Sequence, residues 1–246
     1  MASVDVVAPS VRPWRLRTGA AASVLALSVA TTAWLLDGVR SGRDLSLWDG
    51  PTLRWMVAHR DPVATTVLTD VSALGTDSIL LIVAILAIVL FAVRRRWTEA
   101  LLLAFALVSA ETISRTMKQV VNRARPPAAL VLGPVETNLS FPSGHTIGAA
   151  AFSLALAYLW WRARRGPFRA WLGLGIALIL TVSMAISRLY LADHWLTDVL
   201  ASTALAFGVI AVVAVLDIFL QQRFLSSEHP RSDLPKSGEA SSSSSA

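Results

Sequence analysis

The residues of this chain that are best suited to chemistry fall into three short blocks, each at the end of an apolar stretch. Guanidinium forks and a lysine ammonium bind phosphate oxygens. A histidine can attack phosphorus or move a proton near neutral pH. The blocks therefore predict phosphoryl transfer, with one histidine as nucleophile and the other as acid. They are Lys118 to Arg125-Pro126, Pro142-Ser143-Gly144-His145, and Ser187-Arg188 through His194 to Asp198.

The spacing within two of the blocks suits helices. Lys118 and Arg125 are seven positions apart, so both face one side if the helix of the preceding apolar stretch continues that far. His194 and Asp198 are four positions apart, which makes them neighbours on a helix. The carboxylate can then bond one ring nitrogen and leave the other free to attack, which orients a histidine nucleophile.

The middle block, Ser143-Gly144-His145, comes just before another apolar stretch. If that stretch is a helix, its exposed backbone N–H groups and the positive end of its dipole favour an anion there. Glycine lets an oxyanion approach the backbone closely. The block thus predicts one wall of a phosphate site.

Together the three blocks resemble the signature of the type 2 phosphatidic acid phosphatase family of membrane lipid phosphatases. They read Lys-x6-Arg-Pro, Pro-Ser-Gly-His and Ser-Arg-x5-His-x3-Asp, in order and without a gap. Three ordered motifs are far more specific than one, and the resemblance runs from about residue 40 to 217. Ala192 and Ser202 stand where the family often has glycine, which puts only local packing in doubt.

The resemblance implies a role for each matching residue. His194 attacks phosphorus and forms a phosphohistidine, Asp198 holds its tautomer, and His145 protonates the leaving oxygen. The phosphoryl oxygens are held and their charge is stabilised by a second set of residues. No metal and no cofactor are implied. The second set is Lys118, Arg125, Ser143, Gly144 and Arg188.

The composition predicts an all-α, polytopic membrane protein rather than a soluble α/β enzyme. Hydrophobic residues make up 54% of the chain and charged residues 15%, and the mean hydropathy is +0.59. Six apolar runs approach the roughly 20 residues that a helix needs to cross a bilayer, so we expect a six-span transmembrane helix bundle. The runs are residues 18–36, 77–93, 98–117, 146–161, 169–186 and 196–216.

The basic residues predict the orientation of the bundle. Thirteen lie on one side of the expected spans and nine on the other, where several belong to the three blocks. The positive-inside rule then puts both termini in the cytoplasm of a plasma-membrane protein, and all three blocks on the extracytoplasmic face. The thirteen are Arg12, Arg15, Arg17, Arg94, Arg95, Arg96, Arg162, Arg164, Arg165, Arg169, Arg223, Arg231 and Lys236.

The sequence divides into a cytoplasmic N-terminal segment (1–17), a membrane phosphatase domain (18–220) and a disordered cytoplasmic tail (221–246) that is rich in serine. Residues 37–76 suit short amphipathic helices, which either guide a lipid head group or simply cap the bundle. The apolar loop 126–141 either lines an entrance for a lipid chain or packs on itself. The first apolar run also resembles a secretory signal, although its length favours a retained span.

The absence of cysteine excludes disulfides and thiol chemistry. The net charge of +6 is explained by arginines that flank spans and face anionic lipid, so no nucleic-acid partner is expected. The expected partner is a membrane lipid phosphate: an isoprenoid diphosphate, phosphatidic acid or phosphatidylglycerol phosphate. Two alternatives stay open: a phosphotransferase that uses the same phosphohistidine, and a non-catalytic lipid-binding or transport protein. No oligomeric state is predicted.

Overall fold

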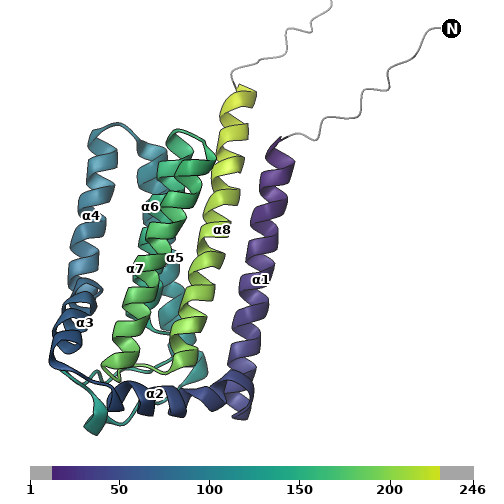
Figure 1. Ribbon diagram of the computed structural model, residues 1–246. Coiled ribbons are helices and arrows are strands. Elements are labelled where there is room, and N and C mark those ends of the chain that lie inside the picture. The colour runs from purple at the N-terminus through teal and green to yellow at the C-terminus, as the bar shows by residue number, and fades with distance from the viewer. Residues whose placement is uncertain (1–12, 228–246) are drawn as a thin grey trace, which may run out of the picture.

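The computed structural model describes residues 13–227, and this part of the chain is helical without strands (Figure 1), as the all-α prediction requires. Its elements are α1 (Pro13–Ser41), the 3-10 helix η1 (Asp44–Trp48), α2 (Asp49–Ala58), α3 (Pro62–Leu74), α4 (Asp77–Val93), α5 (Trp97–Val121), the 3-10 helix η2 (Ala128–Leu130), α6 (Gly144–Ala163), α7 (Pro167–Tyr190) and α8 (Leu196–Ser227).

Six long helices correspond to the six predicted spans. Within the described residues, four of them (α1, α5, α7 and α8) are long and apolar enough to cross a membrane, and α3 with α4, bent by 51° at their junction, forms a fifth candidate. The chain is therefore a multi-pass membrane protein. Because α6 does not reach the same apolar level, the count of six crossings stays a prediction.

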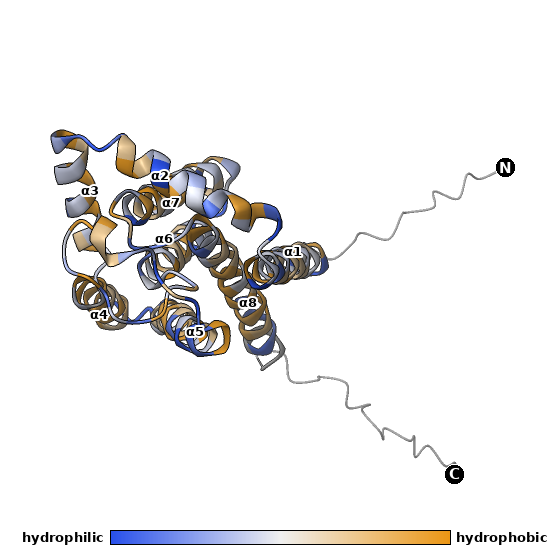
Figure 2. Ribbon diagram, turned by 90° about the horizontal axis from the view of Figure 1, so that it is seen from below, coloured by the Kyte–Doolittle hydropathy of each residue, from blue (hydrophilic) through white to orange (hydrophobic). Residues whose placement is uncertain are grey.

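The reason for the lower hydropathy of α6 is its place at the centre of the bundle. It packs against α5, α7 and α8, as the view along the helices shows (Figure 2). Its Ala150 and Ala151 are completely buried, and they meet Ala110 of α5 and Ala206 of α8. Small side chains let helix backbones approach closely. Since α6 faces other helices more than lipid, it can be less apolar than its neighbours.

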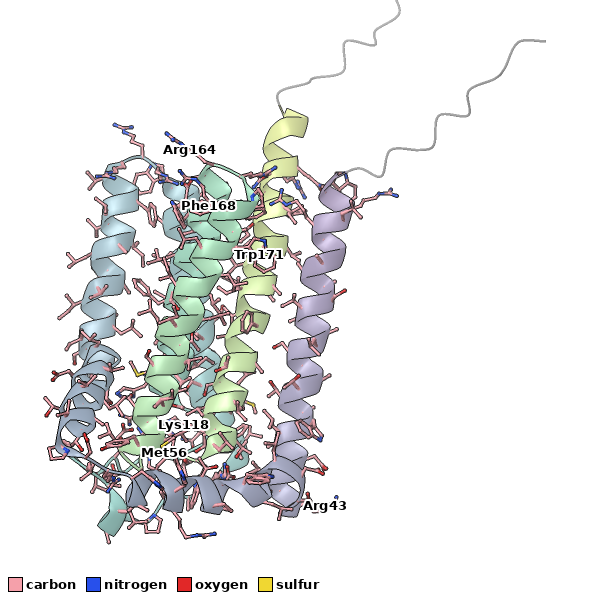
Figure 3. All side chains as sticks on the ribbon, in the orientation of Figure 1. Arg43, Met56, Lys118, Arg164, Phe168 and Trp171 are labelled. Carbon is pink, nitrogen blue, oxygen red and sulfur yellow. The ribbon has the colours of Figure 1, made fainter. Side chains whose placement is uncertain are left out.

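The topology brings all three blocks to one end of the bundle. The end of α5, the start of α6 and the turn from α7 to α8 meet there, next to α2, which lies across this end (Figure 1). Lys118, Met56 and Arg43 lie at this end, and Arg164 lies at the opposite one (Figure 3). The start of α1 and the end of α8 share the end of Arg164. This geometry fits the predicted parity, while the sidedness itself stays a prediction.

One predicted boundary was wrong. Helix α1 begins at Pro13, before the predicted start of the first span at residue 18, so the cytoplasmic assignment of residues 13–17 stays a prediction. Residues 221–227 were assigned to a disordered tail, but α8 continues to Ser227, since apolar residues and glutamines extend its helical pattern. The rest of both terminal segments, 1–12 and 228–246, lies outside the described residues. The short helices predicted within 37–76 are present as η1, α2 and α3.

Candidate active site

The first block does not lie on one helix, so the prediction that the helix of Lys118 reaches Arg125 was wrong. Helix α5 ends at Val121, because Asn122 adopts a left-handed conformation (φ 51°) and caps it. Arg125 therefore lies in the loop beyond the helix. The two cations still converge, since Lys118 Nζ donates to Asn138 Oδ1 at 3.1 Å and Arg125 Nη2 donates to the same oxygen.

Arg125, Arg188 and His145 surround one small volume, which we call the cradle. All three meet the carboxylate of Glu136: Arg125 Nη2 and Arg188 Nη2 each donate to it at 2.5 Å, and His145 Nδ1 lies 3.9 Å from it. Burial lowers the pKa of Arg125 from its ordinary value, against the effect of Glu136, but a guanidinium stays charged near neutral pH. The cradle is thus a positive site that holds an anion.

His194 lies at the back of the cradle and is buried (1% exposed). It precedes α8, which begins at Leu196, so the prediction that His194 and Asp198 share a helix was wrong. The predicted pair is nevertheless formed: His194 Nδ1 lies 3.4 Å from Asp198 Oδ2. The other ring nitrogen, Nε2, lies 3.0 Å from Arg125 Nη1. With the proton assigned to Nδ1, the Nε2 lone pair faces the cradle.

Asp198 is held in place by three further donors, which the sequence did not reveal. Its Oδ2 accepts hydrogen bonds from Ser140 Oγ (2.5 Å) and the backbone N–H of Trp195 (2.9 Å). Its Oδ1 accepts one from Arg123 Nη1 at 2.6 Å, and the side chain is fully buried. A buried carboxylate with this many donors stays ionised and fixed, which suits the orientation of a histidine.

Arg123 also connects this carboxylate to the helix that lies across the bundle end. Its Nη2 donates to Asp49 Oδ2 at 2.5 Å, and Asp49 is the first residue of α2. Asp49 in turn accepts from the backbone N–H and the hydroxyl of Thr197, at 2.9 and 2.8 Å. Helix α2 is therefore attached to the start of α8, beside the candidate nucleophile.

We expect Arg123→Gln to lower kcat by about 10- to 100-fold with little change in KM, because Asp198 then loses a fixed donor and His194 loses its exact orientation. Arg123→Lys keeps the charge without the fork and should recover part of the rate. The matched control is Arg54→Gln, on the exposed face of α2. Steady-state kinetics decide the outcome: a fall in kcat equal to that of the control would contradict the positioning role.

The second block forms the start of α6. Ser143 is its N-cap: the buried hydroxyl accepts from the backbone N–H of Thr146 at 3.4 Å and from the Thr146 hydroxyl at 3.0 Å. Gly144 and His145 follow in the first turn, next to the cradle, where helix N–H groups favour an anion. The Ser143 hydroxyl is thus engaged with the first turn of α6.

Ala192 and Ser202, the two residues that depart from the family pattern, differ in their structural effects. Ala192 has a positive φ of 62°, a conformation that glycine adopts without strain and alanine does not. Ser202 donates from its hydroxyl to the carbonyl of Ser143 at 3.1 Å, so it connects α8 to the cap of α6. The expectation that only packing would be affected was therefore wrong for Ala192.

Burial lowers the pKa of His194 to about 4, while the hydrogen bond to Asp198 opposes the shift. A lowered pKa leaves the imidazole neutral above that value. We expect the ring to remain neutral at pH 5.5, where an imidazole with the ordinary pKa of about 6.5 would be mostly protonated. NMR of 15N-histidine-labelled protein tests this, with the His194 signal assigned by its absence from His194→Ala. A ring that protonates near pH 6.5 would contradict it.

Comparison with known proteins identifies relatives of this chain. The family model of the PAP2 superfamily matches residues 99–220, which contain all three blocks. Phosphatidylglycerophosphatase B of Bacillus subtilis is 30% identical over 165 residues, which are 65% of this chain and 79% of the relative. Decaprenylphosphoryl-5-phosphoribose phosphatase of Mycobacterium tuberculosis is 38% identical over 122 residues, 49% of this chain and 60% of that protein.

One solved structure shares the fold over most of the chain. It is the crystal structure of a transmembrane PAP2-type phosphatidylglycerolphosphate phosphatase from Bacillus subtilis. The TM-score is 0.64 at 24% sequence identity, with 83% of this chain and 98% of that chain covered. At this identity the likeness concerns the fold, including the helices that bring the three blocks together.

Proposed function

Because the chain belongs to the PAP2 superfamily and is a membrane phosphatase, we propose that it hydrolyses a phosphomonoester or the terminal phosphate of a lipid diphosphate through a phosphohistidine on His194. One observation carries the proposal: His194 presents Nδ1 to Asp198 and Nε2 to a cradle formed by Arg125, Arg188 and His145. A binding site alone needs only the cations.

In the proposed first step, His194 Nε2 attacks phosphorus, and the bond from phosphorus to the leaving oxygen breaks as the N–P bond forms. His145 gives its proton to that oxygen. Arg125 and Arg188 hold the equatorial oxygens, where charge is concentrated in the transition state. Asp198 stabilises the positive charge that develops on the ring of His194.

In the second step water attacks the phosphohistidine. His145, now neutral, takes a proton from the water, the N–P bond breaks, and inorganic phosphate leaves. His194 returns to its starting form, so the two steps balance without a further reactant. Lys118, which meets Arg125 at Asn138, adds a third positive charge for a phosphate oxygen.

A lipid substrate is supported by an apolar groove beside the cradle. The groove has a volume of about 380 Å³ and reaches Gly144, at the start of α6. Its walls are mainly aliphatic side chains of α4 and α5, together with the polar Glu111, Thr112 and Arg115 of α5. An acyl or isoprenoid chain could lie along the aliphatic part while its phosphate enters the cradle. The α4 and α5 lining includes Leu80, Leu81, Ala84, Ile85, Ile88, Ala104, Leu107 and Val108.

We further propose that α1, α4, α5, α6, α7 and α8 make six crossings, with both termini cytoplasmic and the site extracytoplasmic. The arginines of the α4–α5 and α6–α7 connections support this orientation, because they lie at the end opposite the cradle. Labelling of single introduced cysteines in intact cells tests it. The chain has no native cysteine, so a cysteine in place of the exposed Val135 should react with an impermeant reagent, and one in place of Arg164 should not.

The direct test of the function is phosphate release by the purified protein in detergent, with a chelator present. The substrates are phosphatidylglycerol phosphate, phosphatidic acid, undecaprenyl diphosphate and decaprenylphosphoryl-5-phosphoribose. We expect release from at least one lipid in plain buffer. If phosphate is lost from the lipid only when an acceptor alcohol is added, the phosphotransferase is the correct function, and binding without turnover would mean a lipid-binding protein.

A further inference from the structure

The cradle already contains an anion that belongs to the chain itself. One carboxylate oxygen of Glu136 accepts from Arg125 and the other accepts from Arg188, while His145 lies 3.9 Å away. Arginine forks match carboxylates and phosphates in the same manner. Glu136 therefore stands where a phosphoryl group would meet the same three side chains.

Arg125 makes further contacts while Glu136 occupies the cradle. Its Nε donates to the backbone carbonyl of Asn138 at 2.8 Å, and its Nη1 donates to the carbonyl of Asp193 at 2.8 Å. The same Nη1 lies 3.0 Å from His194 Nε2, so the lone pair that must attack phosphorus is engaged. Before His194 can react, Arg125 has to release it.

Arg188 has one donor that the carboxylate does not satisfy. Its Nη1 meets Ser72 Oγ at 2.6 Å and Asp193 Oδ2 at 3.2 Å, and its Nη2 meets Glu136. The buried Nε has no hydrogen-bond acceptor among the described residues. Buried donors of this kind are rare and costly. A carboxylate has two oxygens, whereas a phosphoryl group has three, so it can satisfy one more donor than Glu136 does.

The segment that carries Glu136 is an exposed loop between two backbone anchors. The loop is anchored on one side by Leu132 N–H to the carbonyl of Leu191 (3.0 Å) and on the other by Ser140 N–H to the carbonyl of Arg123 (2.9 Å). Between these anchors, Gly133, Thr137 and Asn138 are exposed. Burial opposes ionisation of Glu136, but the charges of Arg188 and Arg125 outweigh burial and hold the pKa of Glu136 at about 2. The carboxylate therefore stays charged near neutral pH.

We propose that Glu136 is a tethered competitor of the substrate, which occupies the cradle in the resting protein and is displaced, together with residues 133–139, when a phosphoryl group binds. This inference rests on the proposed function, since it assumes that the cradle binds phosphate. It makes Glu136 a determinant of selectivity: a ligand enters only if its charge and number of oxygens exceed what one carboxylate offers to Arg125 and Arg188.

The test measures binding of radiolabelled inorganic phosphate to the full chain in detergent by equilibrium dialysis, independently of turnover. Glu136→Gln and Glu136→Ala should bind phosphate at least about tenfold more tightly than the wild type. This gain is expected if Glu136 occupies the cradle about nine-tenths of the time. The matched control is Asp70→Asn, which removes an exposed carboxylate of α3 and should bind as the wild type does.

Equal or weaker binding by both Glu136 variants would overturn the proposal, because Glu136 would then support the arginines rather than compete for them. Absence of binding in every variant would overturn it too. Thermal melts of each variant show that the fold is intact. Failure of the proposed function gives a different result. In that case phosphate binds more tightly to the Glu136 variants, but no lipid releases phosphate.

Discussion

Replacing His194 with alanine is expected to reduce phosphate release by at least about 10³-fold, since loss of the nucleophile of a catalytic triad leaves only the contribution of binding and charge stabilisation. The side chain is buried and makes its contacts with Asp198 and Arg125. Its removal therefore eliminates the atom that attacks phosphorus and leaves the cations of the cradle in place. Initial rates on the best lipid of the panel measure the effect.

The matched control is His59→Ala, because His59 is an exposed residue that follows α2, stacks on Trp55 and bonds the Trp55 carbonyl. That variant should keep the wild-type rate to within about twofold, as surface substitutions usually change little. Binding of inorganic phosphate should survive in His194→Ala. Release that persists in His194→Ala would mean that water attacks phosphorus directly.

Arg188→Lys is expected to lower kcat/KM by about 10²- to 10³-fold, the usual cost of removing one donor that stabilises charge in a transition state. Lysine keeps the positive charge but not the fork, and Arg188 uses the two ends of its fork for different tasks. One end is fixed by Ser72 and Asp193, and the other reaches into the cradle.

The control for this substitution is Arg169→Lys, which alters an arginine at the opposite end of the bundle that lies over the ring of Trp160. It should leave kcat/KM unchanged. Thermal melts separate a loss of stability from a loss of chemistry, because Arg188 is buried (4% exposed). Unchanged kcat/KM in a folded Arg188→Lys would show that charge alone is sufficient and that the fork has no role.

The sequence predicted the helical fold and the end of the bundle where the three blocks meet, because both depend on features that are local in the chain. Apolar runs are contiguous, and the parity of the connections follows from their order. The predicted contact between His194 and Asp198 is present, although only Asp198 lies on α8. The family resemblance was confirmed by the PAP2 model and by the Bacillus subtilis relative.

What the sequence could not supply depends on segments that are distant in the chain. Asp49 is 149 positions from Asp198, and the two carboxylates meet only through Arg123. Glu136 is the one acidic residue of a mostly apolar loop, and the loop's sequence does not indicate that this residue meets Arg125 and Arg188. The end of α5 at the left-handed Asn122 could not be predicted either, because asparagine adopts that conformation only occasionally.

The most direct test of the central claim is to trap the covalent intermediate. The protein is mixed briefly with a substrate labelled with 32P in its terminal phosphate and quenched in alkali, where phosphohistidine survives, and the labelled peptide is sequenced by mass spectrometry. The mechanism predicts label on His194, at a level that decays as phosphate is released, and none in His194→Ala. Turnover without label on His194, or label on another residue, would contradict it.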